Sequence, residues 1–283
     1  MATKTLSENI NQAISDFGNI KQAIINKGVE VPSGTPTSQY GTKIGEIQSG
    51  GSGGSNEDFI GVIERTATNP TLPSGLTKIG DYAFYKNANL VKPTLPNSVT
   101  SIGQYAFQNC YALALTSLPN SLTSIGKNAF QNCQKLAVTS LTNSLTSIGD
   151  SAFQNCSMLA LTSLPNSLTS IGDSAFYWCD RLAFISMPER LTSIGSSAFS
   201  NCGKLSQITF PNSLTNIDGN AFYNCIELTE ITFKGTPNSI STSAFSRCTI
   251  LTTIRVPWAE GAVSGAPWGA TNATLIYNYT ETE

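Results

Sequence analysis

Apolar positions recur with a fixed period of 23 residues through most of this 283-residue chain. Each period carries an Ala-Phe pair, and no insertion interrupts the eight copies. An Ile stands five residues before each Phe, a Leu six residues after it, and another large apolar residue eleven after it. The Phe residues of the period are Phe84, Phe107, Phe130, Phe153, Phe176, Phe199, Phe222 and Phe245. This regularity predicts a solenoid of stacked coils, because one coil cannot bury its apolar side chains alone.

The period also predicts the local structure of a coil. The segment 205–210, Leu-Ser-Gln-Ile-Thr-Phe, alternates like a short strand. Pro-Asn-Ser then makes a turn, and Leu-Thr-Ser-Ile is a second short extended piece. A Gly permits a bend, and Ala-Phe-x-Asn-Cys predicts a short helical or 3-10 turn. We therefore expect a parallel β-sheet on one face of the coils and short helical turns on the other.

The repeated unit Leu-Thr-Ser-Ile-Gly-x-x-Ala-Phe-x-Asn-Cys-x-x-Leu resembles the BspA-like (Treponema pallidum type) leucine-rich repeats. The resemblance covers residues 72 to about 257 and its motif is very specific. It implies a leucine-rich-repeat solenoid that works by binding, because known members are mostly surface proteins that bind host or cell-surface partners. It names no ligand.

Residues 1–48 differ from the repeats and predict a helical anchoring or oligomerisation module. Their apolar residues follow a heptad seam: Leu6, Ile10, Ala13, Phe17, Ile20 and Ile24. So short a helix is marginal alone, so we expect it to form a homo-oligomer, with a trimer as the first guess, or to dock on another protein. The alternative is packing on a second helix of the same chain, near residues 38–47.

The remaining segments complete the predicted organisation. Residues 49–55, Ser-Gly-Gly-Ser-Gly-Gly-Ser, form a flexible linker. Residues 56–71 and 258–283 are expected to cap the two ends of the solenoid at 72–257, because a terminal coil would otherwise expose its core.

Residues 11–47 resemble a small module of phage tail and baseplate proteins, through Ile20-Lys-Gln-Ala-Ile-Ile-Asn-Lys-Gly-Val-Glu-Val-Pro, Tyr40 and the stretch 44–47. This resemblance implies a virion protein made in the host cytoplasm. Its N-terminal helices would bind other tail or baseplate proteins, and its solenoid would bind a host-cell surface protein or glycan. The alternatives are a bacterial or protist cell-surface adhesin and a structural spacer without a ligand.

Composition excludes several classes of function. Charged residues make up 12% of the chain and the net charge is −2, which argues against a nucleic-acid partner. No apolar run is long enough to span a membrane, and the first residues do not form a signal peptide. The chain has no His, which removes His-based catalysis and His metal ligands. We therefore expect no enzyme activity, no metal and no cofactor.

All seven Cys residues stand three positions after a repeat Phe, at Cys110, Cys133, Cys156, Cys179, Cys202, Cys225 and Cys248. A redox ladder or a stack of metal ligands is one interpretation. Buried thiols that pack as small apolar groups are the favoured one. Equivalent side chains in stacked coils point in parallel, which suits disulfide geometry poorly. We expect seven reduced thiols.

One candidate binding surface is the column eight residues after each Phe, whose members include Leu115, Val138, Leu161, Phe184 and Gln207. If these side chains face outward, the four apolar ones form an interaction patch. In coils two to four, however, the next position holds Thr116, Thr139 and Thr162, and in the alternative register the second Leu of Leu-Ala-Leu-Thr turns inward instead. A shift of one residue exchanges the two faces, and the pattern leaves both registers open.

Aromatic residues mark a second candidate surface. Tyr177 and Trp178 stand where most other coils carry Gln-Asn. Exposed aromatic rings suit sugar or peptide partners, because each offers a flat apolar face and a polar edge. Further tyrosines occupy columns expected to be exposed: Tyr82, Tyr85, Tyr105, Tyr111 and Tyr223. The alternative is that these rings only cover the outside of the solenoid.

Overall fold

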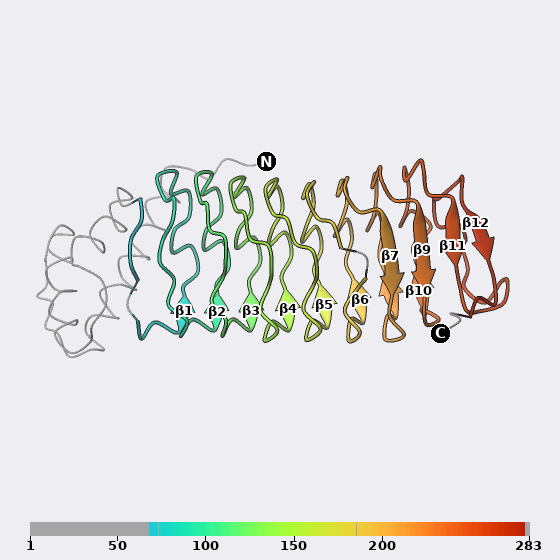
Figure 1. Ribbon diagram of the computed structural model, residues 1–283, viewed down its shortest axis with the longest axis horizontal. Helices are drawn as coiled ribbons and strands as arrows, with labels where there is room; N and C mark the ends of the chain where they lie inside the picture. The colour runs from blue at the N-terminus through green and yellow to red at the C-terminus, as the bar shows by residue number, and fades with distance from the viewer. Residues whose placement is uncertain (1–67, 73, 185, 281–283) are drawn as a thin grey trace, which may run out of the picture.

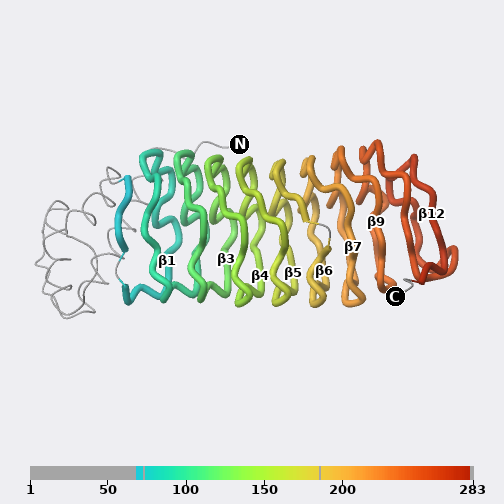
Figure 2. The backbone as a smooth tube through the Cα atoms, viewed as in Figure 1, coloured from blue at the N-terminus to red at the C-terminus, as the bar shows by residue number. Residues whose placement is uncertain are grey.

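The computed structural model describes residues 68–72, 74–184 and 186–280, which form a parallel β-solenoid (Figure 1). The predicted leucine-rich-repeat solenoid is confirmed. Each coil has two legs that run in opposite directions, and Figure 2 shows the coils stacked side by side along one axis. The N-terminal helical module and its seam residues Leu6, Ile10, Phe17, Ile20 and Ile24 lie outside the described residues, as do the linker and most of the first cap.

The first leg of each coil contributes a two-residue strand to an eight-stranded parallel sheet. These strands are the second extended piece expected from the sequence, and Ile partners Ile in neighbouring coils. They are β1 (Lys78–Ile79), β2 (Ser101–Ile102), β3 (Ser124–Ile125), β4 (Ser147–Ile148), β5 (Ser170–Ile171), β6 (Ser193–Ile194), β8 (Asn216–Ile217) and β10 (Ser239–Ile240).

The second leg forms strands only in the later coils. A four-stranded parallel sheet has the order β12-β11-β9-β7. Its members are β7 (Gln207–Phe210), β9 (Glu230–Phe233), β11 (Thr253–Arg255) and β12 (Thr274–Ile276). The expected strand over residues 205–210 is therefore confirmed, and within the described residues this leg forms a sheet only from the sixth coil onward.

The register of coils two to five explains why the second sheet is short. Leu115, Val138, Leu161 and Phe184 are buried, and Thr116, Thr139 and Thr162 are exposed. In later coils the buried residue is one position further along, at Ile208, Ile231 and Ile254. Ile208 and the next buried residue, Phe210, are two positions apart, which suits a strand, whereas Leu115 and the next buried residue, Leu118, are three apart, which does not. The predicted apolar patch at Leu115, Val138, Leu161 and Phe184 is therefore wrong, since these side chains are core.

The Ala-Phe segments are turns, and no helix or 3-10 helix occurs in residues 68–280 outside the two gaps. Alternate N–H groups serve two purposes. Phe153 N donates to Ala175 O of the next coil at 2.8 Å, while Gln154 N donates to Ser151 O of its own turn at 3.1 Å. Ser151 and Asn155 have φ of 52° and 58°. A helix would keep every N–H within its own coil, so the expected helical turn gives way to bonding between coils.

A continuous column of Phe side chains forms the centre of the core. Phe107 and Phe130 stack with ring centroids 5.1 Å apart, and Phe130 and Phe153 with centroids 5.4 Å apart. The stack of coils extends beyond the predicted eight, because the backbone N–H of Phe245 donates to the carbonyl of Trp268, 23 residues later. Trp268 is fully buried, and β12 pairs with β11 in parallel. A ninth, irregular turn thus follows the regular repeats.

The seven Cys side chains are buried, and none forms a disulfide. Each Sγ donates to the carbonyl of a Phe in the preceding coil, as Cys133 does to Phe107 O at 3.0 Å. Burial raises the pKa of five of these thiols well above the ordinary value, and they are Cys133, Cys156, Cys179, Cys202 and Cys225. Cys248 differs, because a hydrogen bond with the Cys225 thiol lowers its pKa. The column therefore links neighbouring coils through buried thiols, as the packing interpretation predicts.

The glycine column marks the closest approach of two coils. A Cβ on Gly149 would lie 2.7 Å from Lys127 N and 2.8 Å from the carbonyl carbon of Gly126. These neighbours are backbone atoms that cannot move aside without breaking the ladder. Gly80 belongs to the same column in the first coil, and a Cβ there would meet nothing within 4 Å.

We predict that Gly149→Ala lowers the free energy of unfolding by about 2–3 kcal/mol, because the added methyl overlaps the backbone of the neighbouring coil. Gly80→Ala is the matched control and should change it by less than about 0.5 kcal/mol. Urea denaturation followed by circular dichroism measures both. Equal effects of the two substitutions would show that the coils do not approach closely at this column.

We predict that stability falls steeply above pH about 8.5, the ordinary pKa of a thiol in an unfolded chain. In the unfolded chain the thiols then ionise, while in the folded chain the five thiols with a raised pKa stay neutral. Stability is complete below that pH and is lost as the pH rises toward the raised pKa of the folded state, by about 1.4 kcal/mol per pH unit for each thiol. Denaturant titrations between pH 7.5 and 9.5 under reductant measure this loss. A thiol titration of unfolded protein made without reductant should find seven thiols, and fewer than six would contradict the absence of disulfides.

Candidate binding surface

We define the turn face as the outward surface of the first leg of the coils, from the two-residue strands through the Ala-Phe turns. In the fifth coil it spans residues 169–178. Its polar side chains form columns along the solenoid. In the Thr column each hydroxyl is used within the fold, since Thr123 Oγ1 donates to Thr100 O at 3.0 Å and Thr169 Oγ1 to Thr146 O at 3.2 Å.

Two amide columns run along the upper part of the turn face. Asn132 Nδ2 donates to Asn109 Oδ1 at 2.7 Å, and Asn155 Nδ2 donates to Asn132 Oδ1 at 2.8 Å. The adjacent Gln column is similar, with Gln131 Nε2 donating to Gln154 Oε1 at 2.5 Å. Both columns are interrupted at the fifth coil, which carries Tyr177 and Trp178 at these positions. The Asn column resumes beyond it, where Asn224 Nδ2 donates to Asn201 Oδ1 at 2.8 Å.

Trp178 stands in a backbone conformation that suits Asn and not Trp. Its φ is 58°, and the equivalent Asn155 and Asn201 have φ of 58° and 59°. Asn tolerates this left-handed region, whereas a bulky side chain there is strained by roughly 1–2 kcal/mol. The indole gains little burial in return, since 46% of Trp178 is exposed. Strain of this kind is typical of functional sites.

Other aromatic residues occupy strained positions of the same face. Tyr82 and Tyr105 have φ of 59° and 57°, and their rings stack with centroids 4.8 Å apart. Tyr85 meets Tyr82 edge-on at 5.6 Å. Toward the other end, the Arg247 guanidinium lies 5.5 Å from the centre of the Tyr223 ring. The turn face therefore presents aromatic rings at three places along the solenoid.

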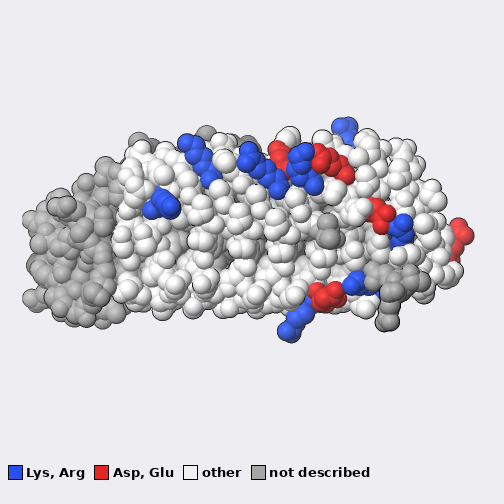
Figure 3. Space-filling view, viewed as in Figure 1, with Lys and Arg blue, Asp and Glu red and all other residues white. Residues whose placement is uncertain are grey.

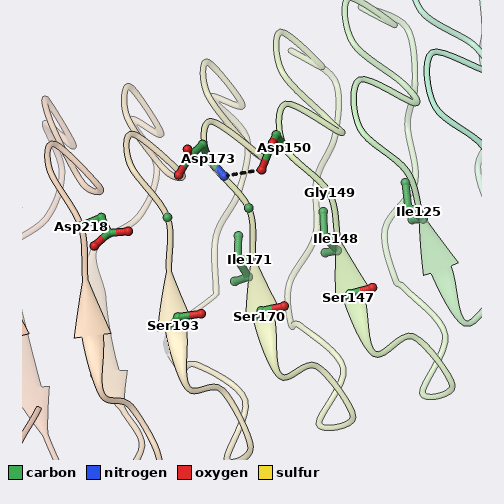
Figure 4. A pocket seen from close by; sticks show the side chains of 12 residues that line it. Ile125, Ser147, Ile148, Gly149, Asp150, Ser170, Ile171, Asp173, Ser193 and Asp218 are labelled. Carbon is green, nitrogen blue, oxygen red and sulfur yellow. Dashed lines mark hydrogen bonds between the residues drawn. The ribbon is translucent and has the colours of Figure 1, made fainter. Parts of the chain in front are cut away.

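A polar trough lies on the turn face, lined by residues of the third to seventh coils (Figure 4). Its volume is about 380 Å³. Glycines and the side chains of Ile125, Ile148 and Ile171 line its middle, with a row of Ser hydroxyls on one side and carboxylates on the other. The lining residues include Ser147, Ser170, Ser193, Gly149, Gly172, Gly195, Asp150, Asp173 and Asp218. Asp218 closes the trough at the seventh coil, because it occupies the position that holds Gly in the coils before it.

Backbone donors orient two of the carboxylates. Asp150 Oδ1 accepts from Asp173 N at 3.2 Å, and Asp173 Oδ1 accepts from Ser196 N at 2.7 Å. Lys127 Nζ lies 3.7 Å from Asp150 Oδ2. Within the described ranges, neither the side-chain carboxylate of Asp218 nor the second carboxylate oxygen of Asp173 has a protein partner. The trough thus offers hydrogen-bond acceptors fixed in place and an excess of negative charge.

Three ion pairs lie elsewhere on the described part of the solenoid, and one of them joins Lys204 and Glu227. Figure 3 shows one face of the solenoid, with few charged side chains over its middle. On the second leg Glu230 forms an ion pair with Arg255, whose hydrogen bond lowers the pKa of that carboxyl. Lys234 pairs similarly with Glu189 at 3.4 Å. Within the described ranges the carboxylates of Asp173 and Asp218 have no cation partner.

The structure separates the predicted site residues into two groups. Tyr177 is half-buried and Trp178 exposed, and both lie on the turn face as expected. Gln207 is exposed on the second leg, but its predicted apolar neighbours are core. Sequence reasoning missed the trough residues Ser170 and Asp173. Their regular recurrence was a visible signal, but only the structure shows which hydroxyl column the fold leaves free.

Two kinds of site were also sought in the described ranges. No group of three or more Cys, Asp or Glu side chains there is arranged to hold a metal ion. No helix in those ranges has the length and apolar character needed to cross a membrane.

Comparison with known proteins identifies the repeats. A family profile described as "BspA type Leucine rich repeat region" matches residues 64–163 and 159–260, with six copies. The chain belongs to this BspA-type leucine-rich-repeat family. Among curated proteins no match is found.

Solved structures of BspA-type and related repeat proteins resemble the chain. The T. pallidum leucine-rich-repeat protein is 30% identical, with a TM-score of 0.51, over 65% of this chain and 83% of that one. A leucine-rich-repeat protein from Bacteroides ovatus is 24% identical, with a TM-score of 0.48, over 75% of this chain and 67% of that one. A leucine-rich cell surface protein from Faecalibacterium prausnitzii is 22% identical, with a TM-score of 0.37, over 73% and 78%.

We predict that Trp178→Asn raises the free energy of unfolding by about 1 kcal/mol, because it removes the left-handed strain of Trp and rejoins the Asn column. The melting temperature should rise by about 2–4 °C. Asn132→Trp is the reverse substitution in the third coil and should destabilise by a similar amount. A Trp178→Asn variant that melts below the native protein would contradict the assignment of strain to this residue.

Proposed function

We propose that this BspA-type chain is a binding protein that displays the turn face of its solenoid to a partner at a cell surface. One observation carries the proposal: an exposed Trp, at position 178, occupies a strained conformation that neighbouring coils reserve for Asn. A residue that weakens the fold and is left in solvent is best explained by a contact made outside the chain.

Membership of the BspA-type family supports the location. Known members are mostly surface proteins that bind host or cell-surface partners, and repeat solenoids commonly act as extended binding scaffolds. Under this proposal the solenoid supplies a rigid surface, and the outward residues of single coils determine what it binds.

A second candidate function is host recognition by a phage tail or baseplate protein. It rests on the resemblance of residues 11–47 to tail modules, and those residues lie outside the described ranges. In that case the N-terminal helices would bind other virion proteins or form a trimer, and the turn face would still meet the partner. Both candidate functions therefore assign Trp178 the same role, which is contact with the binding partner.

The experiment is binding of the labelled full chain to intact bacterial and epithelial cells, measured by flow cytometry. We expect saturable binding that falls at least tenfold in the Trp178→Asn variant. Gln207→Ala on the second leg is the matched control and should bind as the native chain does. If no cell type binds the native chain, or if Trp178→Asn binds unchanged, the proposal fails.

A further inference from the structure

The Ser column of the turn face differs from the Thr column beside it in one decisive respect. The Thr hydroxyls donate to carbonyls of the preceding coil, as Thr146 Oγ1 does to Thr123 O at 3.2 Å. In the described part of the chain, by contrast, the hydroxyls of Ser147, Ser170 and Ser193 have no protein partner. Figure 4 shows these three side chains pointing the same way from β4, β5 and β6. The fold does not need them as hydrogen-bonding groups.

The free hydroxyls repeat at the coil spacing. The Phe rings of the same coils give that spacing as 5.4 Å between the fourth and fifth coils and 5.2 Å between the fifth and sixth. The carboxylates opposite repeat at the same interval from Asp150 to Asp173. A ligand that satisfies such rows must itself present polar groups at regular intervals along the solenoid axis. A linear polymer satisfies this condition, and an isolated small molecule uses only part of it.

The chemistry of the groups narrows the polymer. A Ser hydroxyl donates and accepts, a carboxylate accepts from one or two hydroxyl groups, and both suit neighbouring hydroxyls of a sugar ring. The carboxylates repel phosphates, sulfates and uronic acids. The negative charge of the carboxylates favours an amine-bearing sugar, and it does not repel a neutral sugar. One residue of an extended glycan is about as long as one coil spacing.

The fifth coil also carries a pair of aromatic residues on the leg that bears its trough residues. Ser170 and Asp173 line the trough, and Tyr177 and Trp178 follow them on the same leg. The two rings meet edge-on, with centroids 6.3 Å apart. An exposed indole offers the apolar face of a sugar ring a flat contact, with a polar edge beside it. The hydroxyl row, the fixed carboxylates and the strained Trp thus converge on the fifth coil.

We propose that the trough and the Tyr177–Trp178 pair bind a linear glycan of neutral or amine-bearing sugars, which lies along the solenoid axis with about one sugar for each coil. This inference rests on the proposed function of the turn face and names its ligand class. The contacts are the Ser147, Ser170 and Ser193 hydroxyls and the carboxylates of Asp173 and Asp218, with a sugar ring packed on Trp178.

The test measures binding of the full chain to defined oligosaccharides by isothermal titration calorimetry. The probes are cello-oligosaccharides and chito-oligosaccharides of two to six sugars, and chitosan oligomers as the amine-bearing series. Oligogalacturonate is the anionic control, and an oligolysine peptide represents a basic protein segment. We expect affinity to rise with length up to about five sugars in at least one neutral or amine-bearing series, and no binding of oligogalacturonate.

Three variants locate the site. Ser170→Ala and Asp173→Asn should each weaken glycan binding about tenfold; the first removes a hydroxyl without other partners, and the second keeps an oxygen for Ser196 N. Trp178→Asn should weaken it at least tenfold. The matched control is Ser124→Ala, in the same column but outside the trough lining, which should bind within twofold of the native chain.

Each other outcome overturns the inference. Affinity independent of length, unchanged binding by Trp178→Asn, or preference for oligogalacturonate excludes this site or this ligand class. Binding of oligolysine alone would indicate a basic peptide partner. If no glycan binds but Trp178→Asn still abolishes binding to cells, the glycan inference fails and the proposed function stands. If Trp178→Asn leaves cell binding intact as well, both fail.

Discussion

The rest of the structure depends on backbone hydrogen bonds between one coil and the next. Along the turn face every second N–H donates to the neighbouring coil, as Phe130 N does to Ala152 O at 2.8 Å. These bonds require the coils to lie about 5 Å apart, and the glycine column makes that approach possible. The Phe rings and the Cys thiols then stack within the space enclosed. A period of constant length follows, because one extra residue in one coil would misalign the bonds between that coil and its neighbours.

This constraint confines variation to outward positions, and even there it is selective. The left-handed positions of each turn are best served by Asn or Ser, and the third, fourth, sixth and seventh coils carry only these residues there. Lys86 and Arg247 are exceptions with long cationic side chains, and Tyr82, Tyr105 and Trp178 are exceptions with aromatic rings. Their rings gain only partial burial, so the fold by itself gives no reason to prefer them to Asn. Departures from a repeat that weaken the repeat are the places where a binding function is best sought.

The sequence was sufficient for the period, the core columns and the turn at Pro-Asn-Ser, because identical positions recur and their apolar character does not change. It was insufficient for the second leg. Leu115 and Thr116 differ from Gln207 and Ile208 by a shift of one residue, and both registers bury one large side chain, so packing alone decided between them. The helical turn was predicted from residue preferences. It was displaced by bonding between coils, which acts over 23 residues and is invisible in a local pattern.

The candidate surface was predictable in part for the same reason. Tyr177 and Trp178 could be recognised as exceptions to Gln-Asn, but the strain at Trp178 requires the backbone conformation. The different fates of the Thr and Ser hydroxyls require knowledge of which carbonyls lie within reach. Sequence identifies the columns of a solenoid, and the structure shows which of them the fold leaves unused.

We expect the coils to be interchangeable for folding, whereas binding requires the fifth coil. The most direct measurement is binding of two deletion variants, each lacking one full period, to cells that bind the full chain. One lacks residues 161–183, which include Tyr177 and Trp178, and the other lacks residues 115–137. We predict that both variants fold cooperatively, that the first loses binding and that the second keeps it. Failure of both to fold, or equal binding by both, would contradict the account.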